Sequence, residues 1–489
     1  MGNIKAFYEN YSAKLKPFPY QFQAFQTIKD LEYAAIFHEQ GLGKTKIAID
    51  VLLYWLEKRD IDTVLIVTKK QLIENWLMEL GFHTYLQPEV LTNKRSDNFY
   101  VFNSRTRVVI TNFETVMAEK ERMELFLKCR NVGIIIDEST KLKNPSAKLT
   151  QTFFDLSLLF KLRIIMTGTP VANRPYDIWA QIYFLDHGKH LGCNFNEFKR
   201  DTDLSNRLAN DTIAKTNFEY SIEGIYNKIS TFTVRETKNS SGIILPKKVY
   251  KNIFVDFESK QLEMYRQVIE TMKIEIIKQG KSYIDDDTEN LKRLLRLMEI
   301  TSNPILLDDS YAIPSGKERA LEKIIENIVS KDEKCIVWSN FIENVNLFCR
   351  KYHMYNARKV HGGMTIEDRN KSIEIFKNDE KCKILFATPQ SAKEGLTLTV
   401  ANHVIFYDRG FNLDDYLQAQ DRIHRISQKK KCFIYNLIIK NSIDEWIDKL
   451  LEAKQQAAFL AQGDITLSKY RTTIDYSYGD LVKKILGVD

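Results

Sequence analysis

The chain has 489 residues, 44% of them hydrophobic, with 71 lysines and arginines against 64 aspartates and glutamates. This length allows two or three domains with buried cores, and the mild basic excess permits a nucleic-acid partner without arguing for one. The sequence has no hydrophobic signal core and no apolar run of membrane-spanning length, so we expect an intracellular protein that contacts no membrane.

The six cysteines are scattered along the chain and include no CxxC pair. This spacing speaks against a zinc knuckle and against a disulfide framework, and it favours a reducing compartment. We therefore expect six free thiols.

In chain order, short apolar runs alternate with helical patterns, as is typical of parallel sheets covered by helices. The first set of predicted strands is Ala34–Phe37, Val64–Val67, Val108–Ile110, Gly133–Ile136 and Ile164–Met166. The second set is Cys335–Trp338, Ile384–Phe386, His403–Tyr407 and Phe433–Leu437. The pattern predicts an α/β fold with two lobes.

A charged stretch with amphipathic helical patterns lies between the two sets of strands. We expect a first, ATP-binding lobe over residues 1–185, helical insertions and a linker over 186–314, a second lobe over 315–450 and a helical tail over 451–489. The acidic run at 285–287 is interpreted as a solvated loop rather than a metal site.

The stretch HEQGLGKT, residues 38–45, resembles a phosphate-binding loop with histidine where the strict pattern has glycine. The glycines at 41 and 43, which flank Leu42, allow backbone N–H groups to turn toward a phosphate. Lys44 can neutralise its oxygens and Thr45 can bind magnesium. The apolar run over 46–56 predicts a buried helix that points its N-terminus at the phosphates. A glycine turn that merely caps a helix is the alternative.

A second candidate follows the predicted strand Gly133–Ile136, where Asp137 and Glu138 stand together. Ligands bind at the carboxyl edge of parallel sheets, so Asp137 can hold magnesium through water and Glu138 can polarise an attacking water. An Asp-Glu pair that only caps the next helix is the alternative, and the phosphate-binding loop makes it the weaker one.

Arg422 and Arg425 stand three residues apart in the sequence QAQDRIHR, and we expect them on one face of a helix. Two guanidinium groups presented together can act as arginine fingers on the transferred phosphate. A salt-bridged surface helix is the alternative.

The order of these motifs resembles the Swi/Snf-like DNA translocases of helicase superfamily two, over essentially the whole chain. The motifs that carry the resemblance in the first lobe are Pro19-Tyr20-Gln21, similar to the adenine-reading Q motif; Gly41–Thr45; Thr68 with 71–76, motif Ia; 110–114, motif Ib; Asp137–Thr140; and Thr167–Pro170 with Asn173, motif III. Those in the second lobe are 360–363 with Arg369 and Phe376; 395–399, motif V; and 418–428, motif VI. In this family the residue upstream of the loop need not be glycine, so His38 is no objection.

Further stretches separate the family from other helicases. They are Arg235–Lys238, Leu245–Lys247, Gln261 with Tyr265, Ser302–Pro304 and Ser315–Lys317. The chain departs from the family pattern at Thr140, Thr397 and Ser427, where histidine, asparagine and glycine are usual. The first two lie where the family couples its nucleotide site to DNA, so the coupling is open while the ATPase assignment stands.

The resemblance implies two RecA-like lobes, ATP bound between them, Mg²⁺ and a double-stranded DNA partner. It implies ATP contacts for the loop residues 41–45 and, in addition, for Gln21, Gly395, Arg422 and Arg425. It implies sequence-independent backbone contacts with DNA for Thr68, Lys69, Thr111, Asn112, Ser339, Asn340, Thr388 and Lys393. A compact form of this kind suits the cytoplasm of a bacterium or of a viral host cell, or the nucleus in a eukaryote.

Three functions remain open. The first is an ATP-dependent translocase that moves along duplex DNA without separating the strands. The second is a strand-separating DNA or RNA helicase. The third is a nucleotide-gated DNA-binding subunit with negligible turnover, which the retention of Lys44, Asp137, Glu138 and both arginines disfavours.

Overall fold

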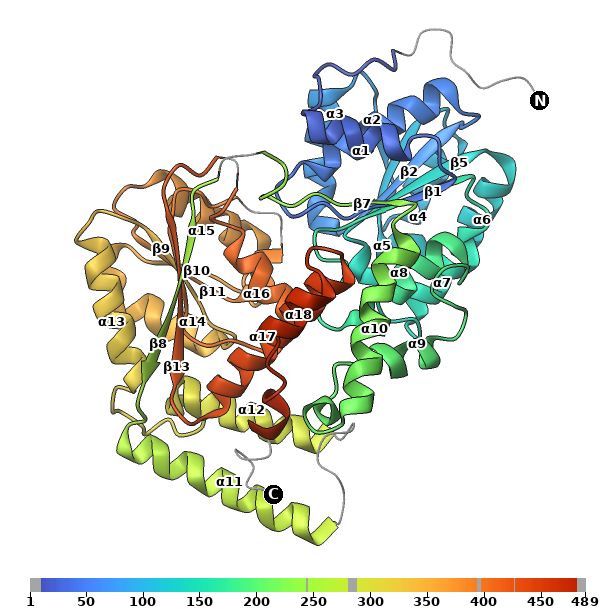
Figure 1. The fold of residues 1–489 in the computed structure, drawn as a ribbon. Helices are drawn as coiled ribbons and strands as arrows, with labels where there is room; N and C mark the ends of the chain where they lie inside the picture. The colour runs from blue at the N-terminus through green and yellow to red at the C-terminus, as the bar shows by residue number, and fades with distance from the viewer. Residues whose placement is uncertain (1–9, 243–244, 280–287, 394–396, 426, 482–489) are drawn as a thin grey trace. The chain divides into compact units, whose positions relative to one another are not determined.

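A computed structural model of the protein describes residues 10–242, 245–279, 288–393, 397–425 and 427–481 (Figure 1). The chain forms two compact units. The first unit comprises Met1–Asp203, Asn217–Ile243 and Ala458–Leu467, and the second comprises Leu204–Thr216, Ile244–Ala457 and Ser468–Asp489.

The first unit contains a seven-stranded parallel sheet with the strand order β3-β4-β2-β5-β6-β1-β7. In chain order its strands are β1 (Tyr33–Ile36), β2 (Thr63–Thr68), β3 (Glu89–Val90), β4 (Val108–Asn112), β5 (Val132–Asp137), β6 (Leu162–Met166) and β7 (Thr233–Val234). Because all strands are parallel, their carboxyl ends meet at one edge of the sheet. The loops that carry the candidate nucleotide residues leave the sheet at this edge.

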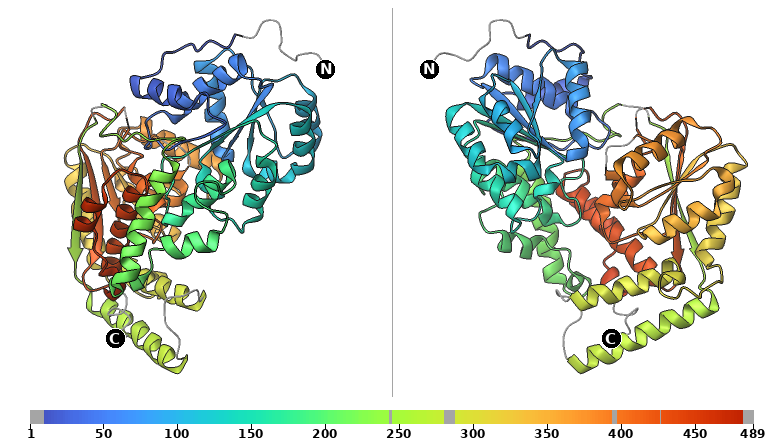
Figure 2. Two further views of the ribbon diagram at one scale, coloured as in Figure 1. Left: turned by 45° about the vertical axis from the view of Figure 1, so that its right-hand side comes forward. Right: turned by 180° about the vertical axis from the view of Figure 1, so that it is seen from behind.

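Helices cover both faces of the first sheet (Figure 2). The connections out of β1 and β2 run one way along the sheet through α2 (Lys44–Lys58) and α3 (Ile73–His83), whereas α6 (Lys120–Cys129) and α7 (Lys148–Ser157) return the other way. Right-handed crossovers therefore place α2 and α3 on one face and α6 and α7 on the other.

The second unit contains a six-stranded parallel sheet with the order β10-β11-β9-β12-β13-β8. Its strands are β8 (Lys248–Val255), β9 (Cys335–Trp338), β10 (Arg358–Val360), β11 (Ile384–Ala387), β12 (His403–Phe406) and β13 (Cys432–Ile439). Its covering helices are α13 (Gly316–Val329), α14 (Ile342–Lys351), α15 (Ile366–Asn378) and α16 (Leu413–Gln420).

Alternation along β9 shows how this sheet is covered. Cys335 and Val337 pack with residues of α13 and α14, whereas Ile336 and Trp338 pack with residues of α15 and α16. Successive side chains of a strand point to opposite faces, so a strand that is apolar throughout requires a helical layer on each side.

The remaining helices are α1 (Pro19–Ile28), α4 (Arg95–Asn103), α5 (Phe113–Ala118), α8 (Trp179–Asp186), α9 (Phe195–Thr202), α10 (Thr212–Ile229), α11 (Ser259–Gln279), α12 (Thr288–Ser302), α17 (Ile443–Ala461) and α18 (Leu467–Thr473). Among the described residues no helix is long and apolar enough to span a membrane. All six cysteines are free thiols, as expected.

All nine predicted strands are confirmed, and the two-lobed parallel α/β fold with them. The expected division of the chain differs from the observed one. The stretch 186–314 is not a separate insertion, because β7 pairs with β1 in the first sheet and β8 pairs with β13 in the second. The boundary expected at residue 450 lies inside α17, and residues 458–467 belong to the first unit. The acidic run at 285–287 lies outside the described residues.

Candidate nucleotide site

The phosphate-binding loop joins β1 to α2 and has the backbone that its glycines predict. Gly41 and Gly43 have φ angles of 85° and 67°, in the left-handed region that side chains disfavour. Gly43 is also the N-cap of α2. A Cβ at Gly43 would stand 2.3 Å from Nε2 of Gln21, which donates a hydrogen bond to the Leu42 carbonyl at 3.2 Å. The predicted Q-motif residue thus braces the loop directly.

Lys44 is the first residue of α2, and its ammonium lies among the carbonyls of its own loop. Nζ donates to the His38 carbonyl at 3.0 Å and to the Glu39 carbonyl at 3.4 Å. Burial lowers the pKa of Lys44 to about 8, and the nearby Glu138 and Asp137 carboxylates oppose this shift. A phosphate, which brings more negative charge, would restore full protonation.

The side chain of His38, the residue that departs from the strict loop pattern, contacts the backbone of β7. Its ring is 2% exposed, and Nδ1 lies 3.4 Å from the Val234 carbonyl of β7. Burial, helped by the charge of Lys44, lowers the pKa of His38 to about 4, so the ring is neutral near pH 7. The residue contributes its backbone carbonyl to hold Lys44.

Asp137 ends β5 at the same edge of the sheet. Its Oδ2 accepts hydrogen bonds from Nε1 of Trp76 at 2.9 Å and from Oγ1 of Thr68 at 3.3 Å. Burial raises the pKa of this carboxyl, and the charge of Glu138 raises it further. Trp76 belongs to the stretch that resembles motif Ia, and nothing in the sequence links it or Thr68 to the carboxylate.

Glu138 follows Asp137 in a left-handed conformation, with φ of 56°. Its Oε2 is buried, accepts no hydrogen bond from a described residue, and lies 3.8 Å from Nζ of Lys69. A buried carboxylate oxygen without a donor requires a water or a ligand to satisfy it. This is the environment that a group polarising a water molecule needs.

The motif III loop closes over the phosphate-binding loop. A Cβ at Gly168 would stand 3.2 Å from Nζ of Lys44, 3.2 Å from the backbone N of Gln40 and 2.5 Å from its Cγ. The Gln181 side chain ties this region to motif II, because it accepts from Ser139 Oγ at 2.8 Å and donates to the Pro170 carbonyl at 2.8 Å.

These residues fit a magnesium nucleotide. Thr45 lies in the first turn of α2, and Oδ1 of Asp137 accepts no hydrogen bond from a described residue, so oxygen donors stand beside the helix N-terminus. Hard oxygen ligands suit Mg²⁺, and the helix N-terminus with Lys44 suits phosphate. No group of three or more histidine, cysteine or acidic side chains in the described part of the chain could hold a metal by itself.

In the second unit, the prediction that Arg422 and Arg425 lie on one helical face is wrong. The helix α16 ends at Gln420, and both arginines lie beyond it. Two contacts outside the helix hold the chain there. Asp421 pairs with Lys248 at 2.7 Å, and the Leu398 amide donates to the Arg422 carbonyl at 2.9 Å.

Two departures from the family pattern, Thr397 in motif V and Ser427 in motif VI, take part in hydrogen bonds between these two motifs. Nη1 of Arg425 donates to Oγ1 of Thr397 at 2.7 Å, and the hydroxyls of Thr399 and Ser427 lie 2.9 Å apart. Burial lowers the pKa of Arg425, although its guanidinium stays charged near pH 7. Thr397 therefore orients Arg425. The predicted nucleotide contact Gly395 lies outside the described residues.

Most of the predicted DNA-contacting side chains are buried. These are Thr68, Thr111, Asn112, Ser339 and Thr388. The Asn112 side chain caps α5 through the Thr115 amide, and Ser339 and Asn340 both donate to the buried carboxylate of Asp408. Lys69 and Asn340 are half-buried, and the structure does not describe the Lys393 side chain.

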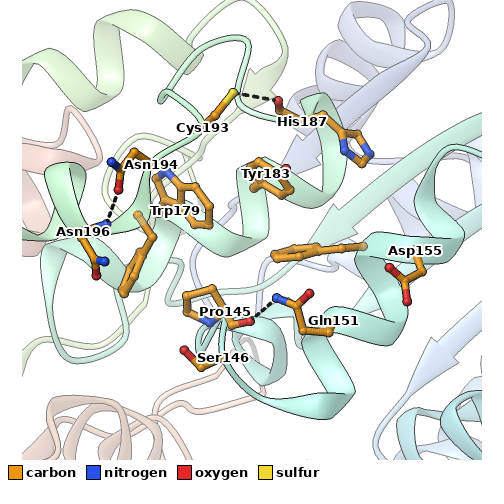
Figure 3. Close-up of a pocket in the computed structure, with 12 residues that line it drawn as sticks. Pro145, Ser146, Gln151, Asp155, Trp179, Tyr183, His187, Cys193, Asn194 and Asn196 are labelled. Atoms are coloured by element: carbon orange, nitrogen blue, oxygen red, sulfur yellow. Dashed lines mark hydrogen bonds between the residues drawn. The ribbon is translucent and has the colours of Figure 1, made fainter.

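A cavity of about 690 Å³ lies elsewhere in the first unit, between α7, α8 and α9 (Figure 3). Trp179 and Tyr183 stack in its wall with ring centroids 4.7 Å apart. Figure 3 shows the side chain of Gln151, another lining residue, donating to the Pro145 carbonyl. Neither lysine nor arginine lines this cavity, so it offers no counter-charge to phosphates and is separate from the nucleotide site.

The chain matches two known protein domain families. Residues 31–306, more than half of the chain, match the SNF2-related domain, and residues 316–427 match the helicase conserved C-terminal domain. The chain belongs to the SNF2-related family. The resemblance inferred from the motifs is confirmed.

Curated SNF2-related relatives are similar over most of this chain. The ISWI chromatin-remodeling complex ATPase ISW1 of Saccharomyces cerevisiae is 25% identical over 93% of the chain and 41% of its own length. The DNA repair and recombination protein RAD54 of the same yeast is 29% identical over 84% and 51%, and the putative ATP-dependent helicase/translocase YwqA of Bacillus subtilis is 27% identical over 86% and 46%. The chain thus spans about half the length of these relatives or less.

Among solved structures, the SWI2/SNF2 ATPase core of Sulfolobus solfataricus in complex with dsDNA aligns with 96% of this chain and 99% of that chain. The alignment has 23% sequence identity and a TM-score of 0.43.

The close approach of Gly168 generates a prediction. Gly168→Ala should weaken nucleotide binding at least tenfold, because the added methyl presses on Gln40 and on the Lys44 ammonium. Binding of a fluorescent ATP analogue measures this. Gly81→Ala on α3 is the matched control, since its Cβ meets nothing within 4 Å, and it should bind as the unmodified protein does. Equal affinity in both variants would place the nucleotide away from motif III.

Proposed function

We propose that the protein is an ATP-dependent translocase on double-stranded DNA, which hydrolyses ATP with Mg²⁺ to move along the duplex without separating its strands. The single observation that carries the ATPase part is the convergence of Lys44, Asp137 and Glu138 at one edge of the first sheet, in a chain of the SNF2-related family. Two relatives support the DNA part, the putative ATP-dependent helicase/translocase YwqA and the DNA repair and recombination protein RAD54.

The proposed chemistry assigns one task to each residue. Lys44 leaves its loop carbonyls and neutralises the β- and γ-phosphate oxygens, while the N-terminus of α2 binds them through its amides. When bound, Mg²⁺ would supply positive charge that offsets the charge developing on the phosphate oxygens. Thr45 and Asp137 are its proposed protein-side partners, and Trp76 and Thr68 hold the Asp137 carboxylate in place.

Glu138 is proposed as the group that orients the attacking water, because none of the residues that the structure describes donates a hydrogen bond to its buried Oε2. Arg425 is proposed as an arginine finger that stabilises charge on the transferred phosphate, with Thr397 fixing its orientation. Arg422 keeps the same proposed role from the family resemblance, without a helical face shared with Arg425.

The DNA contacts are proposed as backbone contacts that do not read sequence. Lys69 and Asn340 are the candidates with exposed side-chain surface, and Lys393 remains a candidate from the family motif. At Thr68, Thr111, Asn112, Ser339 and Thr388 the contacts would come from backbone amides, because those side chains are buried.

Of the three predictions that follow from the proposed function, the first separates binding from hydrolysis. Glu138→Gln should bind ATP with unchanged affinity while DNA-stimulated turnover falls at least a hundredfold, since the amide keeps the shape but cannot accept a proton. Lys44→Ala, its control, should lose both binding and turnover. Equilibrium binding and steady-state phosphate release measure the two effects. Loss of binding in folded Glu138→Gln would give Glu138 a different role.

The second prediction concerns the orientation of Arg425. Arg425→Ala should lower DNA-stimulated turnover about a thousandfold with ATP affinity within a few-fold, the range of an arginine finger. Thr397→Val keeps the side-chain volume but removes the hydroxyl that Arg425 contacts at 2.7 Å, and it should lower turnover about tenfold. Thr399→Val, which removes a hydroxyl bonded to Ser427, is the comparison. Full activity of Arg425→Ala would exclude a catalytic role.

The third prediction separates translocation from strand separation. Unwinding needs a wedge at the fork, and only residues 407–412 separate β12 from α16, which leaves little room for a long hairpin there. ATP turnover should therefore rise with duplex length, and the protein should displace the third strand of a triplex but leave a forked duplex paired. Both assays are run with Lys44→Ala as control. Fork unwinding without triplex displacement would identify a conventional helicase.

A further inference from the structure

Arg235 makes an ion pair and a backbone hydrogen bond that have no part in the proposed nucleotide chemistry. Its Nη1 donates to the Phe37 carbonyl at 2.6 Å, and Nε donates to Oδ1 of Asp464 at 2.6 Å. Nη2 pairs with the second carboxylate oxygen of Asp464, so the contact is bidentate. The side chains of Arg235 and Asp464 are only 12% and 13% exposed, which makes this a largely buried ion pair.

The two partners come from distant parts of the chain. Arg235 directly follows β7, and Asp464 follows the end of α17, in the segment that belongs to the first unit. The segment is closely packed there: a Cβ at Gly463 would stand 2.7 Å from the ring of Tyr226 on α10, and Ala461 is fully buried. Asp464 is therefore held at a defined position against Arg235.

The carbonyl that Arg235 binds belongs to the residue before His38. Phe37 follows β1, and its amide donates to the Val234 carbonyl at 2.9 Å. The next carbonyl, that of His38, accepts the hydrogen bond from Lys44. The path from Asp464 through Arg235 to the start of the phosphate-binding loop thus consists of direct contacts.

We propose that Asp464 is a positioning residue for ATP binding, which fixes Arg235 on the Phe37 carbonyl and thereby sets the path of the phosphate-binding loop. This inference rests on the proposed ATPase function. Without the carboxylate, the Arg235 guanidinium loses its counter-charge in a poorly solvated place and turns toward water, and the Phe37 carbonyl loses its donor. The loop then holds Lys44 and the α2 N-terminus less precisely.

The same sheet offers a matched control at the opposite end of β1. Nη2 of Arg163 pairs with Oε1 of Glu32 at 2.7 Å, and Arg163 is 5% exposed. Glu32→Gln therefore removes a carboxylate from a buried arginine of the same lobe without touching the loop. Asp464→Asn makes the same chemical change beside the loop.

The test measures steady-state ATP hydrolysis with saturating duplex DNA. Asp464→Asn should raise the KM for ATP about fivefold with kcat within twofold, whereas Glu32→Gln should leave KM unchanged. Asp464→Glu, which keeps the carboxylate, should restore KM to within twofold of the unmodified protein. Arg235→Lys, which keeps the charge but cannot serve Asp464 and Phe37 together, should reproduce the increase and replaces Asp464→Asn if that variant does not fold.

A second readout needs no nucleotide. Amide hydrogen exchange in the peptide covering residues 35–40 should be faster in Asp464→Asn than in the unmodified protein and unchanged in Glu32→Gln. An unchanged KM and unchanged exchange in Asp464→Asn would overturn the proposal, as would a lower KM, which would make Arg235 a phosphate-binding cation that Asp464 restrains. If the unmodified protein neither binds nor hydrolyses ATP, the proposed function itself fails, and the exchange result still decides the role of Asp464 in the loop.

Discussion

The candidate site depends on one constraint, which is that a cation must be kept charged in a place with little water. Lys44 lies among loop carbonyls, and burial lowers its pKa to about 8. The carboxylates of Asp137 and Glu138 offset this cost because parallel strands end at one edge and bring β1 and β5 out together. The fold thus assembles opposite charges whose mutual attraction is strong only where water is sparse.

The second unit also buries an acidic side chain, that of Asp408. Asp408 follows β12 and accepts hydrogen bonds from the hydroxyls of Ser302 and Ser339 at 2.7 and 2.5 Å and from the Asn340 amide at 2.6 Å. Satisfying a buried carboxylate takes several donors at once, and these come from two segments that are separate in the sequence, the end of α12 and the loop after β9. The Ser339 side chain, which resembles a nucleic-acid contact by motif, is thereby committed to the interior.

The apolar strands could be predicted because burial on both faces leaves a continuous hydrophobic run, as in Val64–Val67. The strand β8 was missed because lysines and an asparagine interrupt the apolar residues of its sequence, KVYKNIFV, which lies at the edge of its sheet. The glycines and acidic pair of the nucleotide site were predictable, since local backbone chemistry dictates them. The Trp76 bond to Asp137 and the Asp464 bond to Arg235 were not, because each joins residues that only the folded chain brings together.

The motif Ia segment, residues 68–76, connects α3 to the acidic pair Asp137 and Glu138. Over nine residues this segment makes three contacts with the acidic pair: Thr68 and Trp76 with Asp137, and Lys69 with Glu138. Trp76 is 1% exposed, and its hydrogen bond to Asp137 joins α3 to the end of β5. Any partner that pulls on Lys69 or tilts α3 changes the electrostatic environment of both carboxylates at once. The segment therefore transmits a movement of α3 to the acidic pair through these three contacts.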